Sequence, residues 1–210
     1  MKHTLDEEHC DPFLGESDFW VRVEHLGRYL FAANYAKNHK IITSFDGACG
    51  TGYGAAVLSP WVKKVVAVDK SQDINARYER DNICFYSTDL NKSIEKEPFF
   101  DKYDLITCFE TLEHLKNPQF TLEQFRAMLK PGGRLMLSIP RGKFEKIVDG
   151  KPRNPYHLHA ISEDELDEII TLAGFLIEDR KYQARTNVLH RSDNFYKRNN
   201  NLSETQLREF

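Results

Sequence analysis

Apolar residues recur along the chain with two spacings, one typical of helices and the other of buried strands. Phe19, Val23, Leu26 and Leu30 follow steps of three and four residues, which predicts an amphipathic helix over 17–37. Short apolar runs predict buried strands. We expect strands at 41–45, 64–69, 82–87, 103–109, 134–140, 175–182 and 184–190, and further helices at 55–58, 73–80, 117–129 and 162–173. This alternation predicts an α/β fold: a doubly wound, mostly parallel sheet with helices on both faces.

The stretch from Phe45 to Gly54 is the densest in glycine and lies between a predicted strand and a predicted helix. A glycine turn in that position presents free backbone N–H groups and lets a ligand approach the main chain closely. The next predicted strand ends at Asp69. A carboxylate there can accept two hydrogen bonds from a ribose diol. The pairing of turn and acid therefore predicts a nucleoside site.

The acid that opens this stretch, Asp46, indicates which kind of nucleoside fits. A dinucleotide fingerprint places a pyrophosphate at the turn, and a carboxylate would repel it, whereas a ligand with a cationic amine suits an acid. Asp46 followed by glycines at alternate positions, with Ala48 in place of the first glycine, resembles motif I of the class I S-adenosylmethionine-dependent methyltransferases. The turn 130–133, which precedes a predicted strand, also resembles this family.

The resemblance implies a Rossmann-like methyltransferase sheet with S-adenosylmethionine as cofactor. In that family the acid after the third strand, here Asp89, meets the adenine amino group. Carried over onto this sequence, the cofactor-binding residues are Asp46, Ala48, Cys49, Gly50, Gly52, Asp69, Lys70, Asp89, Leu90, Phe109 and Glu110.

Two carboxylates and a histidine lie close together in Glu110-x-x-Glu113-His114. This motif resembles one found in the ubiquinone-pathway O-methyltransferases and in the small-RNA 3′-terminal 2′-O-methyltransferases. In those enzymes a metal polarises the acceptor hydroxyl. The resemblance puts Glu110, Glu113 and His114 on a divalent ion such as Mg²⁺, with His157 as a further ligand. Without a metal, His114 and His157 are the candidate general bases, because histidine titrates near neutral pH.

Composition sets outer bounds on the protein. The 210 residues suit one methyltransferase domain over 1–190, with a helical extension over 1–40 and a polar tail at 191–210. The formal net charge of −3 does not favour a nucleic-acid partner. The four cysteines form no C-x-x-C pair, and the charged first ten residues do not resemble a signal peptide. We expect a cytoplasmic protein without a membrane span.

The resemblance favours methyl transfer to a hydroxyl of a small molecule or sugar, with an amine as a further acceptor group. The segments 28–33, 109–114 and 154–159 are most similar to the bacterial small-molecule and glycan-pathway branch of the family. Two alternatives stay open. A metal-dependent RNA 3′-terminal 2′-O-methyltransferase would use the basic stretch 141–153, and a non-catalytic nucleoside-binding module would use the glycine turn alone.

Overall fold

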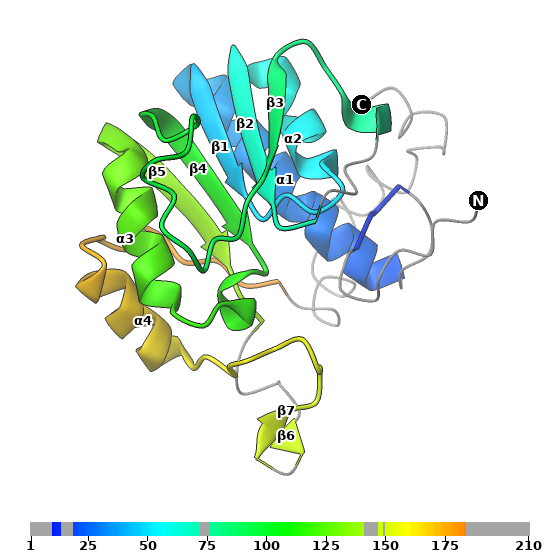
Figure 1. The fold of residues 1–210 in the computed structure, drawn as a ribbon. Coiled ribbons are helices and arrows are strands. Elements are labelled where there is room, and N and C mark those ends of the chain that lie inside the picture. The colour runs from blue at the N-terminus through cyan, green and yellow to red at the C-terminus, as the bar shows by residue number, and fades with distance from the viewer. Residues whose placement is uncertain (1–9, 14–18, 72–75, 141–146, 149, 184–210) are drawn as a thin grey trace.

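The protein is built on a single five-stranded sheet, and a small hairpin stands apart from it (Figure 1). The computed structural model describes residues 10–13, 19–71, 76–140, 147–148 and 150–183. The sheet order is β3-β2-β1-β4-β5 and every pairing is parallel. The strands are β1 (Thr43–Gly47), β2 (Lys64–Asp69), β3 (Ile83–Ser87), β4 (Tyr103–Phe109) and β5 (Leu129–Ser138), with β6 (Ile147–Val148) and β7 (Lys151–Pro152) forming the hairpin. The helices are α1 (Phe19–His39), α2 (Tyr53–Leu58), α3 (Pro118–Met128) and α4 (Glu163–Leu172).

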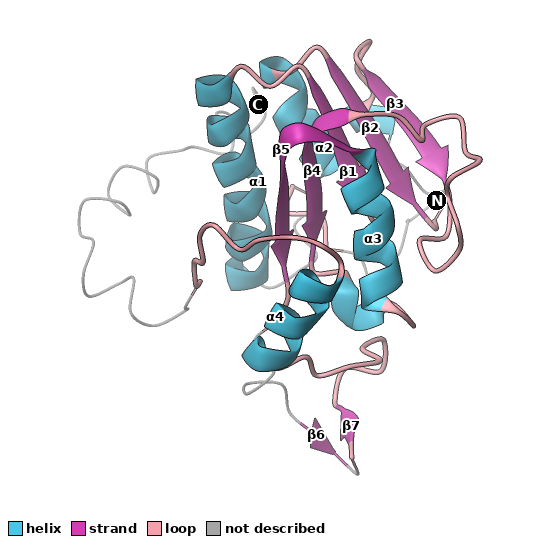
Figure 2. Cartoon of the chain, turned by 90° about the vertical axis from the view of Figure 1, so that its left-hand side faces the viewer, coloured by secondary structure: helices cyan, strands magenta, loops and turns pink. Residues whose placement is uncertain are grey.

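Helices cover both faces of the sheet, α1 and α2 on one side and α3 and α4 on the other (Figure 2). Successive side chains of a strand point to opposite faces, and β2 uses both. Val65 and Ala67 belong to the apolar core that contains α2 and the buried face of α1. Val66 and Val68 belong to the core on the α3 and α4 side. The predicted doubly wound α/β fold is therefore confirmed.

Local sequence signals fix the helix ends. The side chain of Asn117 accepts a hydrogen bond from the N–H of Phe120, and Pro118 occupies the first helical position of α3. Ser162 and Glu165 form a reciprocal capping box at the start of α4. The chain leaves α4 through Gly174, which has φ of +82°.

Several predicted elements differ in the structure. Residues 175–182, predicted as a sixth strand, form no strand, because their backbone pairs with no strand of the described sheet. The strand predicted at 134–140 begins earlier, at Leu129, because the ladder with β4 shifts register between Tyr103 and Leu105. The helix predicted at 73–80 retains one 3-10 turn, Ala76–Tyr78; its first residues lie outside the described part. The seventh predicted strand, 184–190, also lies outside it.

The membrane and domain predictions have different outcomes. None of the helices in the described part of the chain combines the length and the apolar character needed to cross a membrane. The division into a domain over 1–190 and a tail over 191–210 stays a prediction, since the tail lies outside the described residues.

A close contact between α1 and α2 leads to a stability prediction. A Cβ on Gly54 would lie 2.1 Å from Cζ of the Tyr29 ring, and Tyr29 is buried. Gly54→Ala should therefore lower the free energy of unfolding by about 1–3 kcal/mol through overpacking, measured by urea denaturation.

Gly27→Ala is the matched control. The nearest atom to its new Cβ is the flexible end of Gln183 at 3.3 Å, and Gly27 lies inside α1. We expect a gain of up to about 1 kcal/mol from helix propensity. Equal destabilisation by both substitutions would contradict the packing argument.

Candidate functional site

The parallel sheet brings the predicted site residues to one edge. The carboxyl ends of parallel strands lie together, and ligands of open α/β sheets bind there. Asp46 lies in β1 and Asp69 ends β2. Asp89 comes shortly after β3, and Glu110 directly follows β4. The four acids spread along the sequence therefore belong to one edge.

The glycine loop between β1 and α2 depends on left-handed backbone conformations. Gly50 and Gly52 have φ of +56° and +91°, and Ala48 has φ of +61° although it carries a Cβ. The N–H of Cys49 donates to the carbonyl oxygen of Val68 at 2.9 Å, which fastens the loop to the end of β2. Burial raises the pKa of the Cys49 thiol, so this cysteine is a neutral packing residue of the loop.

Asp69 holds the glycine loop against β2. One carboxylate oxygen accepts from the N–H of Gly50 at 2.8 Å, and the other accepts from the N–H of Ser71 at 2.8 Å. The side chain is nearly buried. A carboxylate oxygen can accept more than one hydrogen bond, so an acid that organises the loop can also accept from a ligand hydroxyl.

Asp46, the acid that the sequence predicts to suit a cationic amine, lies in β1 inside the fold. It is fully buried and accepts hydrogen bonds from the Tyr29 hydroxyl at 2.9 Å and from the Thr107 hydroxyl at 2.7 Å. Burial raises the pKa of Asp46 to about 7; the hydrogen bonds from Thr107 and Tyr29 oppose this shift, and the charge of Asp69 adds to it. The group is therefore poised between its neutral and ionised forms near pH 7.

The region after β3 is a tight turn centred on Asp89. Its carboxylate accepts from the backbone N–H and the side-chain amide of Asn91, both at 3.0 Å, and the backbone bond is the main cause of its lowered pKa. Leu90 is buried in the core, whereas Lys70 is exposed. Asp89 thus has a turn-forming role here, and the adenine contact expected from the sequence stays a prediction.

A short N-terminal segment is anchored beside the glycine loop, a feature that the sequence did not reveal. Asp11 is fully buried. It accepts from the hydroxyl of Thr51, in the loop, at 2.9 Å and from the hydroxyl of Tyr78 at 2.8 Å. Phe13 packs against the rings of Tyr53 and Tyr78. Residues 10–13 therefore pack beside the loop through the contacts of Asp11 and Phe13.

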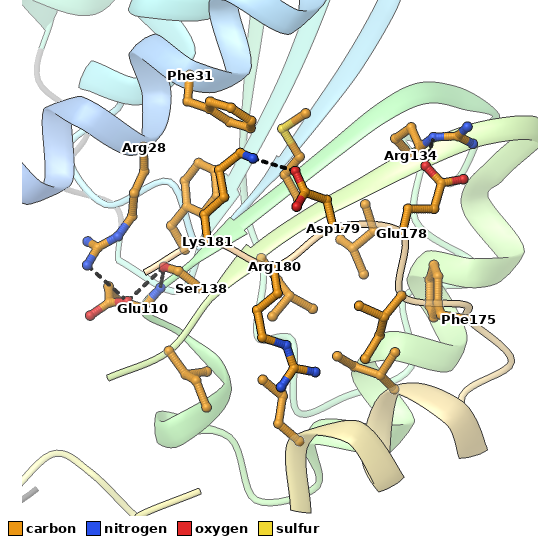
Figure 3. Close-up of a pocket in the computed structure, with 18 of the residues that line it drawn as sticks. Arg28, Phe31, Glu110, Arg134, Ser138, Phe175, Glu178, Asp179, Arg180 and Lys181 are labelled. Carbon is orange, nitrogen blue, oxygen red and sulfur yellow. Dashed lines mark hydrogen bonds and ion pairs between the residues drawn. The ribbon is translucent and has the colours of Figure 1, made fainter. Parts of the chain in front are cut away.

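A large groove of about 2380 Å³ opens beside the end of β4 (Figure 3). Five predicted site residues line it: Phe109, Glu110, Glu113, His114 and His157.

At the end of the groove beside β4, Arg28 forms an ion pair with Glu110 at 3.3 Å, and the Ser138 hydroxyl donates to Glu110 at 2.7 Å. The Nη1 atom of Arg28 is buried, and the described residues provide it with no hydrogen-bond partner. A guanidinium with one satisfied end suits a carboxylate or phosphate.

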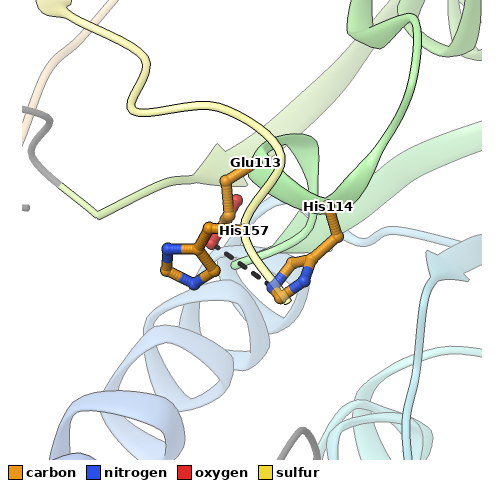
Figure 4. A group of neighbouring side chains, drawn as sticks. All are labelled: Glu113, His114 and His157. Carbon is orange, nitrogen blue, oxygen red and sulfur yellow. Dashed lines mark ion pairs between the residues drawn. The ribbon is translucent and has the colours of Figure 1, made fainter. Parts of the chain in front are cut away.

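Glu113, His114 and His157 form one cluster (Figure 4). Their ligand atoms all lie within 4.8 Å of one another, and the two imidazole rings meet edge to face at 4.9 Å. Glu110, the third ligand expected from the sequence, is not in this cluster. Its carboxylate instead contacts Arg28 and Ser138, so the structure does not bring Glu110 together with Glu113 and His114, and the ligand set stays a prediction.

The hydrogen-bond contacts of the histidine rings indicate where their protons lie. His114 Nδ1 lies 3.0 Å from the carbonyl oxygen of Tyr156, which can only accept, so we assign the proton to Nδ1. His114 Nε2 then faces Glu113 Oε1 at 3.9 Å. Two acceptors that face each other are stabilised by a proton or cation between them. The side-chain amide of Asn154 lies 2.9 Å from His157 Nε2, and His159 Nε2 contacts the Leu115 carbonyl oxygen at 2.9 Å, a tethering role.

Comparison with known proteins shows which family this chain resembles. A family profile described as "Methyltransferase domain" matches residues 28–179. A probable S-adenosylmethionine-dependent methyltransferase of Mycolicibacterium smegmatis is 29% identical over 83% of this chain and 66% of its own length. A relative of the same description from Mycobacterium tuberculosis is 26% identical over 82% of this chain and 61% of its own. The chain therefore spans slightly less than two thirds of these curated relatives.

Other matches cover less of the molecule. A ubiquinone biosynthesis O-methyltransferase of Coxiella burnetii is 30% identical over 48% of this chain and 44% of its own. A Bacillus halodurans protein crystallised and assigned as a methyltransferase superposes with a TM-score of 0.55 and 27% identity, over 65% of this chain and 64% of its own. The YcgJ protein of Bacillus subtilis, at 20% identity over 71% of this chain and 68% of its own, shares the fold with a TM-score of 0.60. The sheet, the glycine loop and the match over 28–179 together establish that this chain belongs to the methyltransferase-domain family.

Proposed function

We propose that the protein transfers a methyl group from S-adenosylmethionine to a hydroxyl of a small molecule or sugar. The observation that carries this proposal is the glycine loop with its amides turned by positive φ angles and fastened to Asp69. The family match and the names of the mycobacterial relatives support the cofactor.

The proposed cofactor lies along the carboxyl edge of β1, β2 and β3. Asp69 accepts from the ribose hydroxyls, and Asp89 from the adenine amino group. At the amino-acid end, the buried Nη1 of Arg28, which no described residue engages in a hydrogen bond, is suited to the carboxylate. The ionised form of Asp46 stabilises the cationic end through the Tyr29 and Thr107 hydroxyls that contact it.

The transfer step requires little from the protein beyond orientation. The methyl carbon moves from the sulfonium to the acceptor oxygen, and the electron pair of the broken bond stays on sulfur to give S-adenosylhomocysteine. The acceptor hydroxyl loses its proton to His114 Nε2, which carries the ring's lone pair when Nδ1 holds the proton. Glu113, whose Oε1 faces that nitrogen, stabilises the imidazolium that results.

A metal-assisted version is the second candidate, favoured by the cluster of Glu113, His114 and His157. The donor set of one carboxylate and two imidazoles fits zinc better than Mg²⁺, which prefers oxygen ligands. The same three residues would hold the ion, and the ion would supply Lewis-acid polarisation of the acceptor hydroxyl. The partial similarity to a ubiquinone biosynthesis O-methyltransferase supports a hydroxyl acceptor in both versions.

RNA is the less favoured acceptor, because the net charge of −3 gives the chain no general attraction for phosphate. The cytoplasmic location expected from the cysteine pattern stays a prediction.

Binding of S-adenosylhomocysteine tests the cofactor assignment. Asp69→Ala should weaken binding by roughly 10- to 150-fold, since a charged hydrogen bond contributes about 1.5–3 kcal/mol. Arg28→Ala should weaken binding of S-adenosylhomocysteine but not of adenosine, which lacks the carboxylate. Titration calorimetry measures both.

Asp101→Ala is the control for this experiment, because Asp101 is exposed and precedes β4 at the opposite edge of the sheet. Absence of heat with S-adenosylmethionine and with S-adenosylhomocysteine in the unmodified protein would refute the cofactor assignment. Labelled-methyl transfer into a cell extract, followed by separation of small molecules from RNA, identifies the acceptor class.

The raised pKa of Asp46 predicts that cofactor binding releases a proton. The folded pKa is about 7, and a nearby cation favours the ionised form, so binding should lower that pKa. At pH 7 about half a proton should leave per ligand bound. Below pH 7 affinity should fall by up to about tenfold per pH unit, because the proton must first be removed.

Calorimetry in two buffers with different heats of ionisation measures this release, and Asp46→Asn should abolish it. If the observed heat of binding is the same in both buffers for the unmodified protein, Asp46 does not respond to the ligand.

Variants of the histidine cluster distinguish a mechanism with His114 as general base from a metal-assisted mechanism. His114→Ala should leave S-adenosylhomocysteine affinity unchanged and lower methyl transfer by roughly 10²- to 10⁴-fold. If the metal version holds, the purified protein binds zinc by calorimetry, and Glu113→Gln or His157→Ala weakens that binding.

Glu110→Gln is the matched control, because Glu110 contacts Arg28 and Ser138 instead of the cluster. Zinc binding lost equally in Glu110→Gln would contradict a ligand set confined to the cluster. Full methyl transfer in His114→Ala would rule out His114 as the base.

A further inference from the structure

The hairpin of β6 and β7 projects from the molecule. Figures 1 and 2 show it, in two views at right angles, standing clear of the sheet and of the helices. Ile147 pairs with Pro152 and Val148 with Lys151. Gly150 makes the connection with φ of +75°. A projecting hairpin of two short strands buries almost no surface of its own, so its side chains remain open to a partner.

The hairpin exposes two adjacent aliphatic side chains. Ile147 is 53% exposed and Val148 is 54% exposed. Alternate residues of a strand point to opposite faces, so both faces of the hairpin present apolar surface. Further along the same loop Leu158 is 51% exposed. Single exposed apolar residues are ordinary on protein surfaces. An apolar pair on a projecting hairpin, however, is suited to insertion into an apolar environment outside the protein.

The sequence around this apolar pair is basic. The stretch 141–153 carries five basic and two acidic residues, a net charge of +3 in a chain whose formal net charge is −3. Lys151 and Arg153 are both exposed. The sequence that carries the hairpin is therefore basic, and the rest of the chain has a negative net charge.

We propose that this hairpin docks the protein on an anionic lipid surface. Ile147 and Val148 enter the boundary between headgroups and acyl chains, and Lys151 and Arg153 contact the lipid phosphates. An RNA partner would use the cations but would gain nothing from the exposed aliphatic pair, because nucleic acid is bound through phosphate contacts and aromatic stacking.

The loop that carries the hairpin is fastened to the candidate site. The N–H groups of Leu158 and His159 both donate to the carbonyl oxygen of Glu113, at 2.7 Å and 3.2 Å. His114 Nδ1 contacts the Tyr156 carbonyl oxygen. Docking through the hairpin would therefore hold the cluster of Glu113, His114 and His157 near the lipid surface, where an amphiphilic acceptor would be found.

Vesicle co-sedimentation of the full chain tests the proposal. The unmodified protein should bind vesicles that contain phosphatidylglycerol and should bind pure phosphatidylcholine vesicles at least about tenfold more weakly. Ile147→Ser with Val148→Ser, and separately Lys151→Glu with Arg153→Glu, should each weaken binding to the anionic vesicles at least about tenfold.

Leu176→Ser is the matched control, since Leu176 is 92% exposed but lies outside the hairpin; it should bind like the unmodified protein. Circular dichroism and S-adenosylhomocysteine affinity, unchanged in every variant, separate loss of docking from misfolding and from failure of the proposed cofactor site. Unchanged sedimentation of both hairpin variants, or equal binding to neutral and anionic vesicles, would overturn the proposal. Binding of short RNA that is lost in the charge variant, without vesicle binding, would also overturn it.

Discussion

The contact between Asp69 and the glycine loop is the constraint on which the site depends. The loop has to leave β1, turn through residues with positive φ and start α2 at Tyr53. Such a turn forms few backbone bonds of its own, so its amides need partners elsewhere. Asp69 supplies one to Gly50 and Val68 supplies another to Cys49. Strand β2 therefore fixes the shape of the loop as well as presenting an acid to a ligand.

A second constraint is the charge balance beneath the loop. Burying a carboxylate is costly unless hydrogen bonds compensate, and Asp46 receives them from Tyr29 of α1 and Thr107 of β4. These contacts tie the first helix and the fourth strand to the same acid. Because burial still raises its pKa to about 7, this core position can respond to a cation bound above it.

The two halves of the candidate site are built differently. The cofactor half rests on strand ends and on the glycine loop, held by the parallel strand ladder and by the Asp69 carboxylate. The acceptor half combines the 3-10 turn at Leu112–His114 with the loop that carries His157, and that loop is attached through the Glu113 carbonyl oxygen and the Tyr156 carbonyl oxygen. Loops of this kind vary between relatives while the scaffold stays constant, which suits an edge where different acceptors are selected.

The sequence by itself determined the elements with strong local signals. Continuous apolar runs identified β2, β3 and β4, and the Asn117-Pro118 pair and the capping box of Ser162 and Glu165 marked helix starts. The glycine pattern with Asp69 identified the loop and the strand end at which we propose that the cofactor binds. These signals are local: each depends on residues close together in the chain. The strand predicted at 175–182 was wrong because a strand is defined by its hydrogen-bonding neighbour, and apolar residues alone do not specify one.

Only the tertiary structure decided which distant side chains meet. It placed Glu110 against Arg28 and Ser138, buried Asp46 beneath Tyr29, and brought Asp11 to Thr51 and Tyr78. No local signal in the sequence predicted these contacts, because each joins residues of different elements whose separation depends on how helices pack on the sheet. The residue types needed for the chemistry were therefore visible in the sequence, whereas their partners, burial and protonation followed from packing.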